Sequence, residues 1–240
     1  YISEDEKYLI EELTLTGEIN GTDFGFLREM AGRANYGRGY ISNFIDTGGR
    51  LSVLDLSGVK IVAGGVYLSG DDMDLGYDEL QLQHNDEIPP IVFWGCNRLS
   101  SVVFPNDLSY VGGEAFTGTT WYDNQLDGLL YIGNILYKYK GEMPENTNIS
   151  VKEGTTSISC LAFYDCKGLN TISIPQSVTV IGKDEDYRDN KKSYGTNHLH
   201  VICGVFYGCT GMTSITIPNS VKTIANQTFS ECTNLTSIND

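Results

Sequence analysis

The sequence is poor in basic residues and contains no long hydrophobic run. It has 16 Lys and Arg against 31 Asp and Glu, which gives a formal net charge of −15. Such a chain repels phosphate backbones and anionic lipid headgroups, so we expect no nucleic-acid binding and no polybasic membrane contact. No run of about 18 apolar residues occurs, so no segment is expected to span a bilayer. An acidic surface would suit a cationic partner, although solubility explains it equally well.

Histidine is also scarce, with three residues in the chain. No nucleophile elbow, phosphate-binding loop or His-Glu-x-x-His motif is present. The most metal-like set is His198, His200 and Cys203, but it lacks an evident fourth ligand for zinc. The acidic stretch 71–74 lacks the Gly and the distant Glu of a calcium loop. We therefore expect no catalytic residue, no metal and no cofactor, and a protein that is not an enzyme.

A short phrase recurs along the chain. Residues 169–175 (LNTISIP) match 212–218 (MTSITIP) and 99–105 (LSSVVFP), and 235–238 begin the phrase again. The motif Phe-x-x-Cys precedes each copy, at Phe93 to Cys96, Phe163 to Cys166, Phe206 to Cys209 and Phe229 to Cys232. The last two of these cysteines are 23 residues apart, which is a repeat length typical of leucine-rich repeats.

The phrase has the alternation of a short strand. Ile172 and Ile174 point to one face, and Thr171 and Ser173 point to the other. One such strand cannot bury its apolar face alone, but stacking at roughly 5 Å per repeat creates a continuous core. The Pro after each strand ends the pairing because it has no amide donor. We predict a β-rich or α+β leucine-rich-repeat solenoid of stacked short parallel strands, joined by loops or short helical turns.

Residues 1–50 do not show the repeat and are expected to form an N-terminal cap over the exposed end of the core. Within them, 13–16 could be a first strand. Thr22 could cap a helix over 23–31 that Gly32 ends, although Gly25 stands where a capping-box Glu would be. Residues 51–240 are assigned to the solenoid.

Two stretches depart from the repeat. Residues 118–148 contain 129–132 and 135–139 around Gly133-Asn134, which predicts a hairpin that projects from the solenoid or interrupts it. Its aromatic residues could bind a partner or form the hairpin's own small core. The second stretch is a charged insert at 183–202, which reads as a solvated loop or as part of a binding face.

The six cysteines divide into two groups by their place in the repeat. Cys166, Cys209 and Cys232 share one position and are expected to stack as free, buried thiols. Cys160 and Cys203 share another position, which argues for a structural role and against a nucleophile paired with His200. These two could lie near enough for a disulfide, and the sequence leaves that bridge open.

The phrase at 174–181, Ala162 to Cys166 and 169–175 together resemble the BspA-like leucine-rich repeats. The likeness covers most of the chain, with 21–32 and 54–57 similar to the N-terminal cap of such proteins and 118–141 to an insertion in gut Bacteroidetes members. It departs from the pattern at Thr119, where Cys is expected, and at Thr228, where Ala is usual. The resemblance implies a surface protein of Bacteroidetes or of protozoan parasites, and adhesion to host matrix proteins such as fibronectin. It supplies no catalytic residue.

From this we expect a non-enzymatic, extracellular or cell-surface scaffold that binds protein and is a monomer. The alternatives are a glycan-binding module of a polysaccharide-use system and a structural spacer. Because the sequence starts at Tyr1, a secretory signal or lipid anchor could have been removed, and membrane contact is expected only through such an anchor. The candidate binding surface combines small polar strand residues with aromatic side chains: Ser101, Thr171, Ser173, Ser214, Thr216, Ser237, Trp121, Tyr122, Tyr187 and Tyr194.

Overall fold

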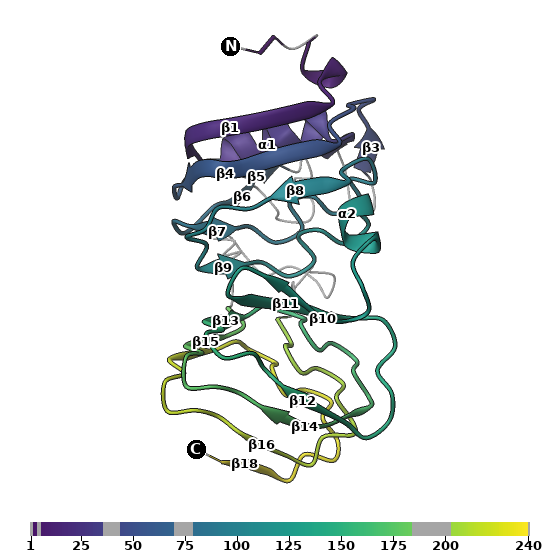
Figure 1. The fold of residues 1–240 in the computed structure, drawn as a ribbon, viewed down its shortest axis with the longest axis vertical. Coiled ribbons are helices and arrows are strands. Elements are labelled where there is room, and N and C mark those ends of the chain that lie inside the picture. Colours follow the sequence, from purple (N-terminus) through teal and green to yellow (C-terminus); the bar gives the residue numbers. More distant parts are fainter. Residues whose placement is uncertain (1, 4–5, 36–43, 70–78, 184–202, 240) are drawn as a thin grey trace, which may run out of the picture. The chain divides into compact units, whose positions relative to one another are not determined.

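The computed structural model describes residues 2–3, 6–35, 44–69, 79–183 and 203–239 (Figure 1). These residues fall into two compact units. The first contains the described residues of Tyr1–Asp107 and Glu114–Asn124, and the second contains those of Leu108–Gly113, Gln125–Asp184 and Ile202–Asp240. Both units contain parallel strands, as the leucine-rich-repeat prediction requires.

A three-stranded parallel sheet organises the first unit. Strand β1 (Glu12–Ile19) pairs with β4 (Val53–Ile61), and β4 pairs with β8 (Ser101–Val103). Leu54 lies opposite Leu13 on one side and Val102 on the other, and Leu54 and Val102 are buried. The predicted first strand and the copy of the phrase at 99–105 therefore contribute strands to one sheet, with β4 between them.

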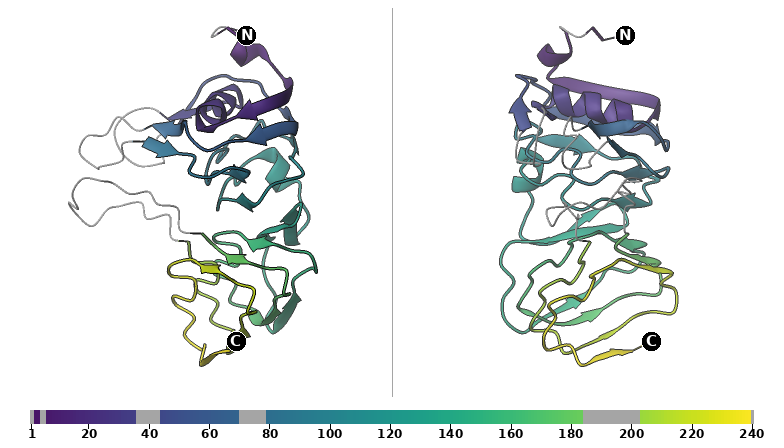
Figure 2. Two further views of the ribbon diagram at one scale, coloured as in Figure 1. Left: turned by 90° about the vertical axis from the view of Figure 1, so that its left-hand side faces the viewer. Right: turned by 180° about the vertical axis from the view of Figure 1, so that it is seen from behind.

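Helix α1 (Gly21–Met30) lies against one face of β1 and β4, as seen from behind in Figure 2. Asn20, and not Thr22, is its N-cap. The Asn20 side chain accepts from the Thr22 amide at 2.8 Å, and the Asp23 carboxylate accepts from the Asn20 amide at 2.8 Å. The prediction of Thr22 was thus wrong by two residues: a capping box does exist, and Asp23 completes it in place of Glu.

The remaining elements of the first unit are short. They are η1 (Lys7–Leu9), α2 (Thr120–Asp123), the strand β7 (Glu87–Ile88), the antiparallel pair β2 (Arg33–Asn35) and β3 (Phe44–Asp46), and the antiparallel pair β5 (Val66–Ser69) and β6 (Glu79–Gln81).

The second unit has strands on two sides of its core. One side carries β12 (Thr147–Ser150) paired with β14 (Leu169–Ser173), and β16 (Ser214–Thr216) paired with β18 (Ser237–Asn239). The other side is a five-stranded sheet in the order β10 (Gly128–Ile132), β11 (Ile135–Lys140), β13 (Ser157–Ile158), β15 (Val180–Ile181) and β17 (Thr223–Ile224). Strand β9 (Tyr110–Val111) also belongs to this unit.

The predicted hairpin is present as β10 and β11, with Gly133 and Asn134 between the strands. Of the two predicted arrangements, projection from the solenoid does not hold for β11, because this strand pairs in parallel with β13. Leu136, Ile158, Ile181 and Ile224 are successive partners across this sheet, and the first three are fully buried. The second strand of the hairpin therefore acts as one rung of the repeat.

The phenylalanines of the repeat stack through the core. Phe163 and Phe206 have ring centroids 5.4 Å apart, and Phe206 and Phe229 have centroids 5.7 Å apart. In the first unit, Phe93 stacks on Phe116 at 5.6 Å. The stacked rings hold consecutive repeats together. We call these residues the ladder Phe residues: Phe93, Phe116, Phe163, Phe206 and Phe229.

Tyr139 takes the place of this Phe in the repeat that contains the hairpin. In the other repeats the ladder Phe amide donates to the residue before the next ladder Phe, as Phe163 does to Val205 and Phe206 to Thr228. The Tyr139 amide donates in the same way to the Ala162 carbonyl at 2.7 Å, and its ring lies 6.5 Å from that of Phe163.

The residue two positions after the ladder Phe has a left-handed backbone in every described repeat. Counting the repeat in which Tyr139 replaces the Phe, glycine occupies four of these positions, and acidic residues occupy two, with φ of 56° at Asp165 and 59° at Glu231. Glycine adopts this conformation without strain, whereas other residues do so at a cost of about 1–2 kcal/mol. Every described repeat therefore has the same left-handed turn, but only the repeats with glycine adopt it without strain.

Candidate functional site

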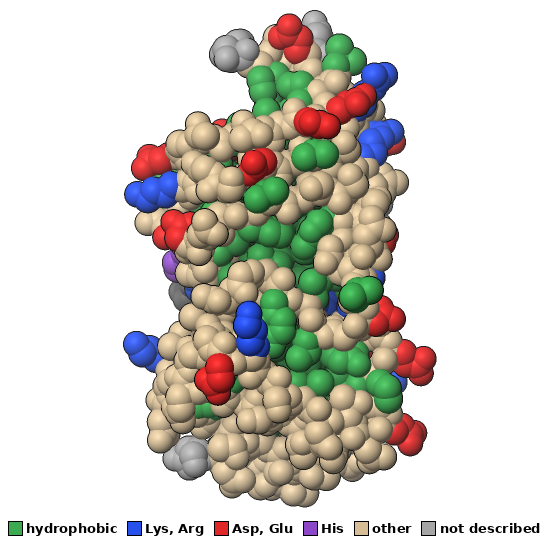
Figure 3. Space-filling view, viewed as in Figure 1, with side chains coloured by type: hydrophobic (Ala, Val, Ile, Leu, Met, Phe, Trp, Pro, Cys, Tyr) green, Lys and Arg blue, Asp and Glu red, His purple; other side chains and the backbone are tan. Residues whose placement is uncertain are grey.

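The outward side of β12, β14, β16 and β18 carries small polar side chains. Thr171, Ser173 and Thr216 are exposed, and Ser214 and Ser237 are half-buried. In the lower part of Figure 3, the surface over these strands is largely tan, with few hydrophobic or charged side chains. The alternation of apolar and polar residues predicted this arrangement. In the structure, Ile172 and Ile215 on the opposite side of the strands are buried.

Strand pairing holds these side chains in register. Ser173 lies opposite Ser150, Ser214 opposite Ser237, and Thr216 opposite Asn239. Asn148 Oδ1 accepts from Thr171 Oγ1 at 2.7 Å and from Asn170 Nδ2 at 3.0 Å. The surface is thus a set of hydroxyl and amide groups on a rigid backbone, which can hydrogen-bond to a ligand over a wide area.

Ser101 is placed differently. It lies on β8 in the first unit, is half-buried, and is the partner of Val53 on β4. Two residues later on the same side stands Val103, with 45% of its surface exposed. The outward side of β8 is therefore less polar than that of β14 or β16.

Trp121 and Tyr122 lie on α2 and are both half-buried. The Trp121 ring packs edge-on against Phe104 at 5.3 Å and Phe116 at 5.0 Å. The indole therefore helps to hold α2 on the unit. A binding role for these two residues stays a prediction. Tyr187 and Tyr194 lie outside the described residues, as does nearly all of the insert 183–202.

The two departures from the repeat pattern are accommodated by hydrogen bonds. Thr119 is fully buried; its hydroxyl donates to the Phe116 carbonyl at 2.7 Å and accepts from the Tyr122 amide at 3.0 Å, which caps α2. Thr228 is also buried, and its hydroxyl donates to the Ala225 carbonyl at 2.6 Å. Both hydroxyls bond to a carbonyl three residues earlier, so neither is left unsatisfied in the core.

The predicted ladder of free thiols is confirmed. Cys166, Cys209 and Cys232 are buried and unbridged, and so is Cys96 in the first unit. The Cys232 thiol donates to the Phe206 carbonyl at 2.9 Å. Burial raises the pKa of Cys96 and of Cys166 to about 12, and it also raises the pKa of Cys209 and of Cys232. Thiols of this kind stay protonated at neutral pH and are poor nucleophiles.

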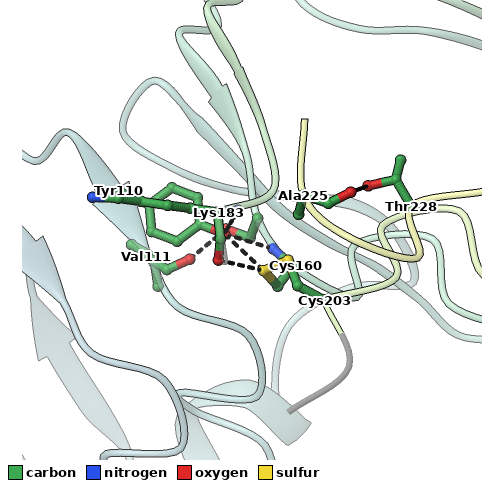
Figure 4. The surroundings of a disulfide bond; sticks show 8 residues. Tyr110, Val111, Cys160, Lys183, Cys203, Ala225 and Thr228 are labelled. Carbon is green, nitrogen blue, oxygen red and sulfur yellow. Dashed lines mark hydrogen bonds between the residues drawn. A yellow bond between two sulfur atoms is a disulfide. The ribbon is translucent and has the colours of Figure 1, made fainter. Parts of the chain in front are cut away.

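Cys160 and Cys203 form a disulfide, with Cα atoms 4.7 Å apart (Figure 4). Tyr110 organises the surroundings of the bridge. Its hydroxyl accepts from the Cys160 amide at 2.9 Å and from the Lys183 amide at 3.1 Å. Gly182 is packed tightly as well, since a Cβ there would lie 2.8 Å from Cys203 Sγ and 2.6 Å from Val205 Cγ2. The bridge and Tyr110 thus hold residues on both sides of the stretch 184–202.

Within the described ranges, no group of three or more His, Cys, Asp or Glu side chains could hold a metal ion. His198, His200 and residues 71–74 lie outside the described residues. One buried cation stands out in the first unit: desolvation lowers the pKa of Arg28 to about 10, so the guanidinium is charged at neutral pH. No helix in the described part of the chain is long and apolar enough to cross a bilayer.

This fold and these ladders define a leucine-rich-repeat protein. The sequence profile of the BspA type leucine rich repeat region matches residues 78–140, 131–185 and 200–239, in six copies. The match covers more than half of the chain, and the chain belongs to this family. No curated protein matches the sequence.

Solved structures give weaker likenesses. A leucine-rich repeat protein from Bacteroides ovatus is 19% identical over 85% of this chain and 43% of that chain, with a TM-score of 0.32. A leucine rich cell surface protein from Faecalibacterium prausnitzii is 18% identical over 79% of this chain and 63% of that chain, with a TM-score of 0.28. A leucine-rich repeat protein from Eubacterium ventriosum is 14% identical over 81% and 50% of the two chains, with a TM-score of 0.27. The chain spans about half the length of these proteins.

Proposed function

We propose that this chain is a non-enzymatic scaffold that binds a protein ligand outside the cell or at the cell surface, with a host matrix protein as the expected kind of ligand. The observation that carries the proposal is the outward side of β12, β14, β16 and β18. There, Thr171, Ser173 and Thr216 are exposed on strands whose opposite side is buried core. Such a surface offers many hydrogen-bonding groups on a backbone that does not need to be ordered on binding.

Two further observations support the proposal. Leucine-rich repeats of this family form a scaffold suited to protein interaction. The Cys160–Cys203 disulfide fits an oxidising compartment, since such bridges persist in secreted and surface-exposed proteins and are rare in a reducing cytosol. We propose a location outside the cell on this basis.

A solid-phase binding screen tests the proposal. The purified chain is offered fibronectin, fibrinogen, collagen and a glycan array at physiological salt. An unrelated acidic protein of similar net charge serves as the control for charge alone. Saturable binding to a protein, absent from the control, is the expected result. Binding to glycans alone would favour the glycan-binding alternative, and binding to nothing would favour a structural spacer.

A further inference from the structure

Tyr164 and Tyr207 form an aromatic pair on the outside of the second unit. Each directly follows a ladder Phe, so each ring points away from the core while Phe163 and Phe206 point into it. Their ring centroids are 5.0 Å apart and the ring planes differ by 7°. Tyr164 is 48% exposed, and Tyr207 is half-buried. The stack is therefore held in register by the repeat and still reaches the surface.

A carboxylate lies beside this stack. Asp165 follows Tyr164, and its amide donates to the Tyr207 carbonyl at 2.7 Å, which fixes its backbone against the next repeat. Its side chain is exposed. Asp165 Oδ1 lies 3.0 Å from where a Cβ on Gly208 would stand, so the glycine leaves room for the carboxylate. The Lys167 ammonium, 3.4 Å from Asp165 Oδ2, forms an exposed pair, which is a weak interaction in water.

We propose that Tyr164, Tyr207 and Asp165 anchor an arginine side chain of a protein ligand. This inference rests on the proposed function and names the chemistry that one part of the ligand would supply. A guanidinium can stack on an aromatic face and pair with a neighbouring carboxylate at the same time, which an ammonium does less well. The net charge of −15 favours a basic partner. Tyr and Arg are also the residue types that dominate the energetics of protein interfaces.

The geometry favours a cationic side chain over a sugar. Tyr164 and Tyr207 are stacked with planes only 7° apart, so the two rings do not lie side by side as one flat platform for a sugar. What they present is a ring stack flanked by a negative charge. That arrangement suits one planar cation better than a neutral, extended pyranose surface.

The test uses two labelled peptides, octa-arginine and octa-lysine, whose binding to the full chain is followed by fluorescence anisotropy at physiological salt. The variants are Tyr164→Ala, Tyr164→Phe and Asp165→Asn. Leu126→Ala is the matched control, because Leu126 is 88% exposed in the same unit. We expect octa-arginine to bind about fivefold tighter than octa-lysine. Tyr164→Ala should remove this preference, Tyr164→Phe should keep it, and Asp165→Asn should weaken octa-arginine binding.

Tyr164→Ala could instead bind octa-arginine with the same affinity as the parent chain and Leu126→Ala. In that case attraction by overall charge explains the binding, and the inference is overturned. Glycan binding that depends on Tyr164 while peptide binding does not would also overturn it. The outcome is separable from that of the proposed function. A matrix protein that binds the parent and Tyr164→Ala equally would contradict this inference alone. Tyr164-dependent peptide binding without any matrix protein ligand would contradict the proposed function alone.

Discussion

The Cys209 thiol donates a hydrogen bond to the Phe163 carbonyl, 3.1 Å away in the preceding repeat. The Cys232 thiol does the same to Phe206 at 2.9 Å. In each case the cysteine lies three residues after its own ladder Phe, and its thiol donates to the carbonyl of the ladder Phe in the preceding repeat. The recurring Phe-x-x-Cys spacing in this chain therefore joins successive repeats: the ring packs against the next ring, and the thiol hydrogen-bonds to a buried carbonyl.

Thiol labelling tests this account of the cysteines. In the native protein, Cys96, Cys166 and Cys209 are at most 8% exposed, and burial raises the pKa of each. We expect an aromatic disulfide reagent at pH 8 to label these thiols only as fast as the protein unfolds. In denaturant without a reductant, four thiols should react, because the other two cysteines are bridged. Rapid labelling of the native chain, or six reactive thiols, would contradict the account.

Alkaline pH should destabilise the protein. The pKa of Cys96 and that of Cys166 are raised from 9.0 to about 12 in the folded chain, so the unfolded chain loses these protons first. The contribution of the two thiols to stability is complete below pH 9 and is lost as pH rises toward 12. Near pH 10, we expect the free energy of unfolding to fall on the order of 1 kcal/mol per pH unit for each thiol. Urea denaturation across this range measures the slope, which Cys166→Ala should make shallower; an unchanged slope in that variant would contradict the assignment.

The disulfide is expected to make a large contribution to stability. Cys160 and Cys203 are 43 residues apart, and the loop-entropy model gives about 4 kcal/mol for a loop of that length. We therefore predict that Cys160→Ser/Cys203→Ser unfolds at a markedly lower urea concentration than the parent. The parent in reductant should approach the variant once the bridge is reduced. Equal midpoints for the oxidised parent and the variant would show that the bridge does not form in solution.

Glu231 offers a test of the left-handed turn. It stands two residues after Phe229 with a φ of 59°, at the position that glycine occupies in four other repeats. We predict that Glu231→Gly raises the free energy of unfolding by up to about 1 kcal/mol, because the relief of strain exceeds the entropy that glycine costs. Glu231→Gln removes the same charge but keeps the strain, so thermal unfolding of that variant should show no such gain. A gain of equal size in both variants would assign the effect to charge.

Much of the fold could be predicted from the sequence because the repeat states its pattern several times. The strands at 101–103, 169–173 and 214–216, the buried Phe and Cys positions and the two-residue hairpin turn are all present. Each follows from local alternation or from a position that recurs at a fixed period. These are signals that a single sequence contains.

The features that were missed depend on geometry that the repeat does not state. Asn20 caps α1 because its backbone is still extended where the helix starts. The sequence does not show at which residue the helical backbone begins, so it pointed to Thr22 instead. Tyr139 takes the place of a ladder Phe, although the sequence of a hairpin does not show whether its tyrosine lies in the core or on the surface. The Cys160–Cys203 bridge was left open since neighbouring cysteines in register can be either free or bonded, and their partner Tyr110 lies 50 residues from Cys160.

The measurement that tests the central claim most directly is the dissociation constant for the protein found in the binding screen, taken by surface plasmon resonance. Thr171→Arg/Thr216→Arg places two bulky cations on the outward side of β14 and β16, where both threonines are exposed. Thr223→Arg/Thr233→Arg makes the same change at exposed threonines elsewhere in the same unit. The account predicts that the first pair weakens binding by roughly tenfold or more and that the second leaves it nearly unchanged. Equal affinities for the two variants would contradict a binding surface on these strands.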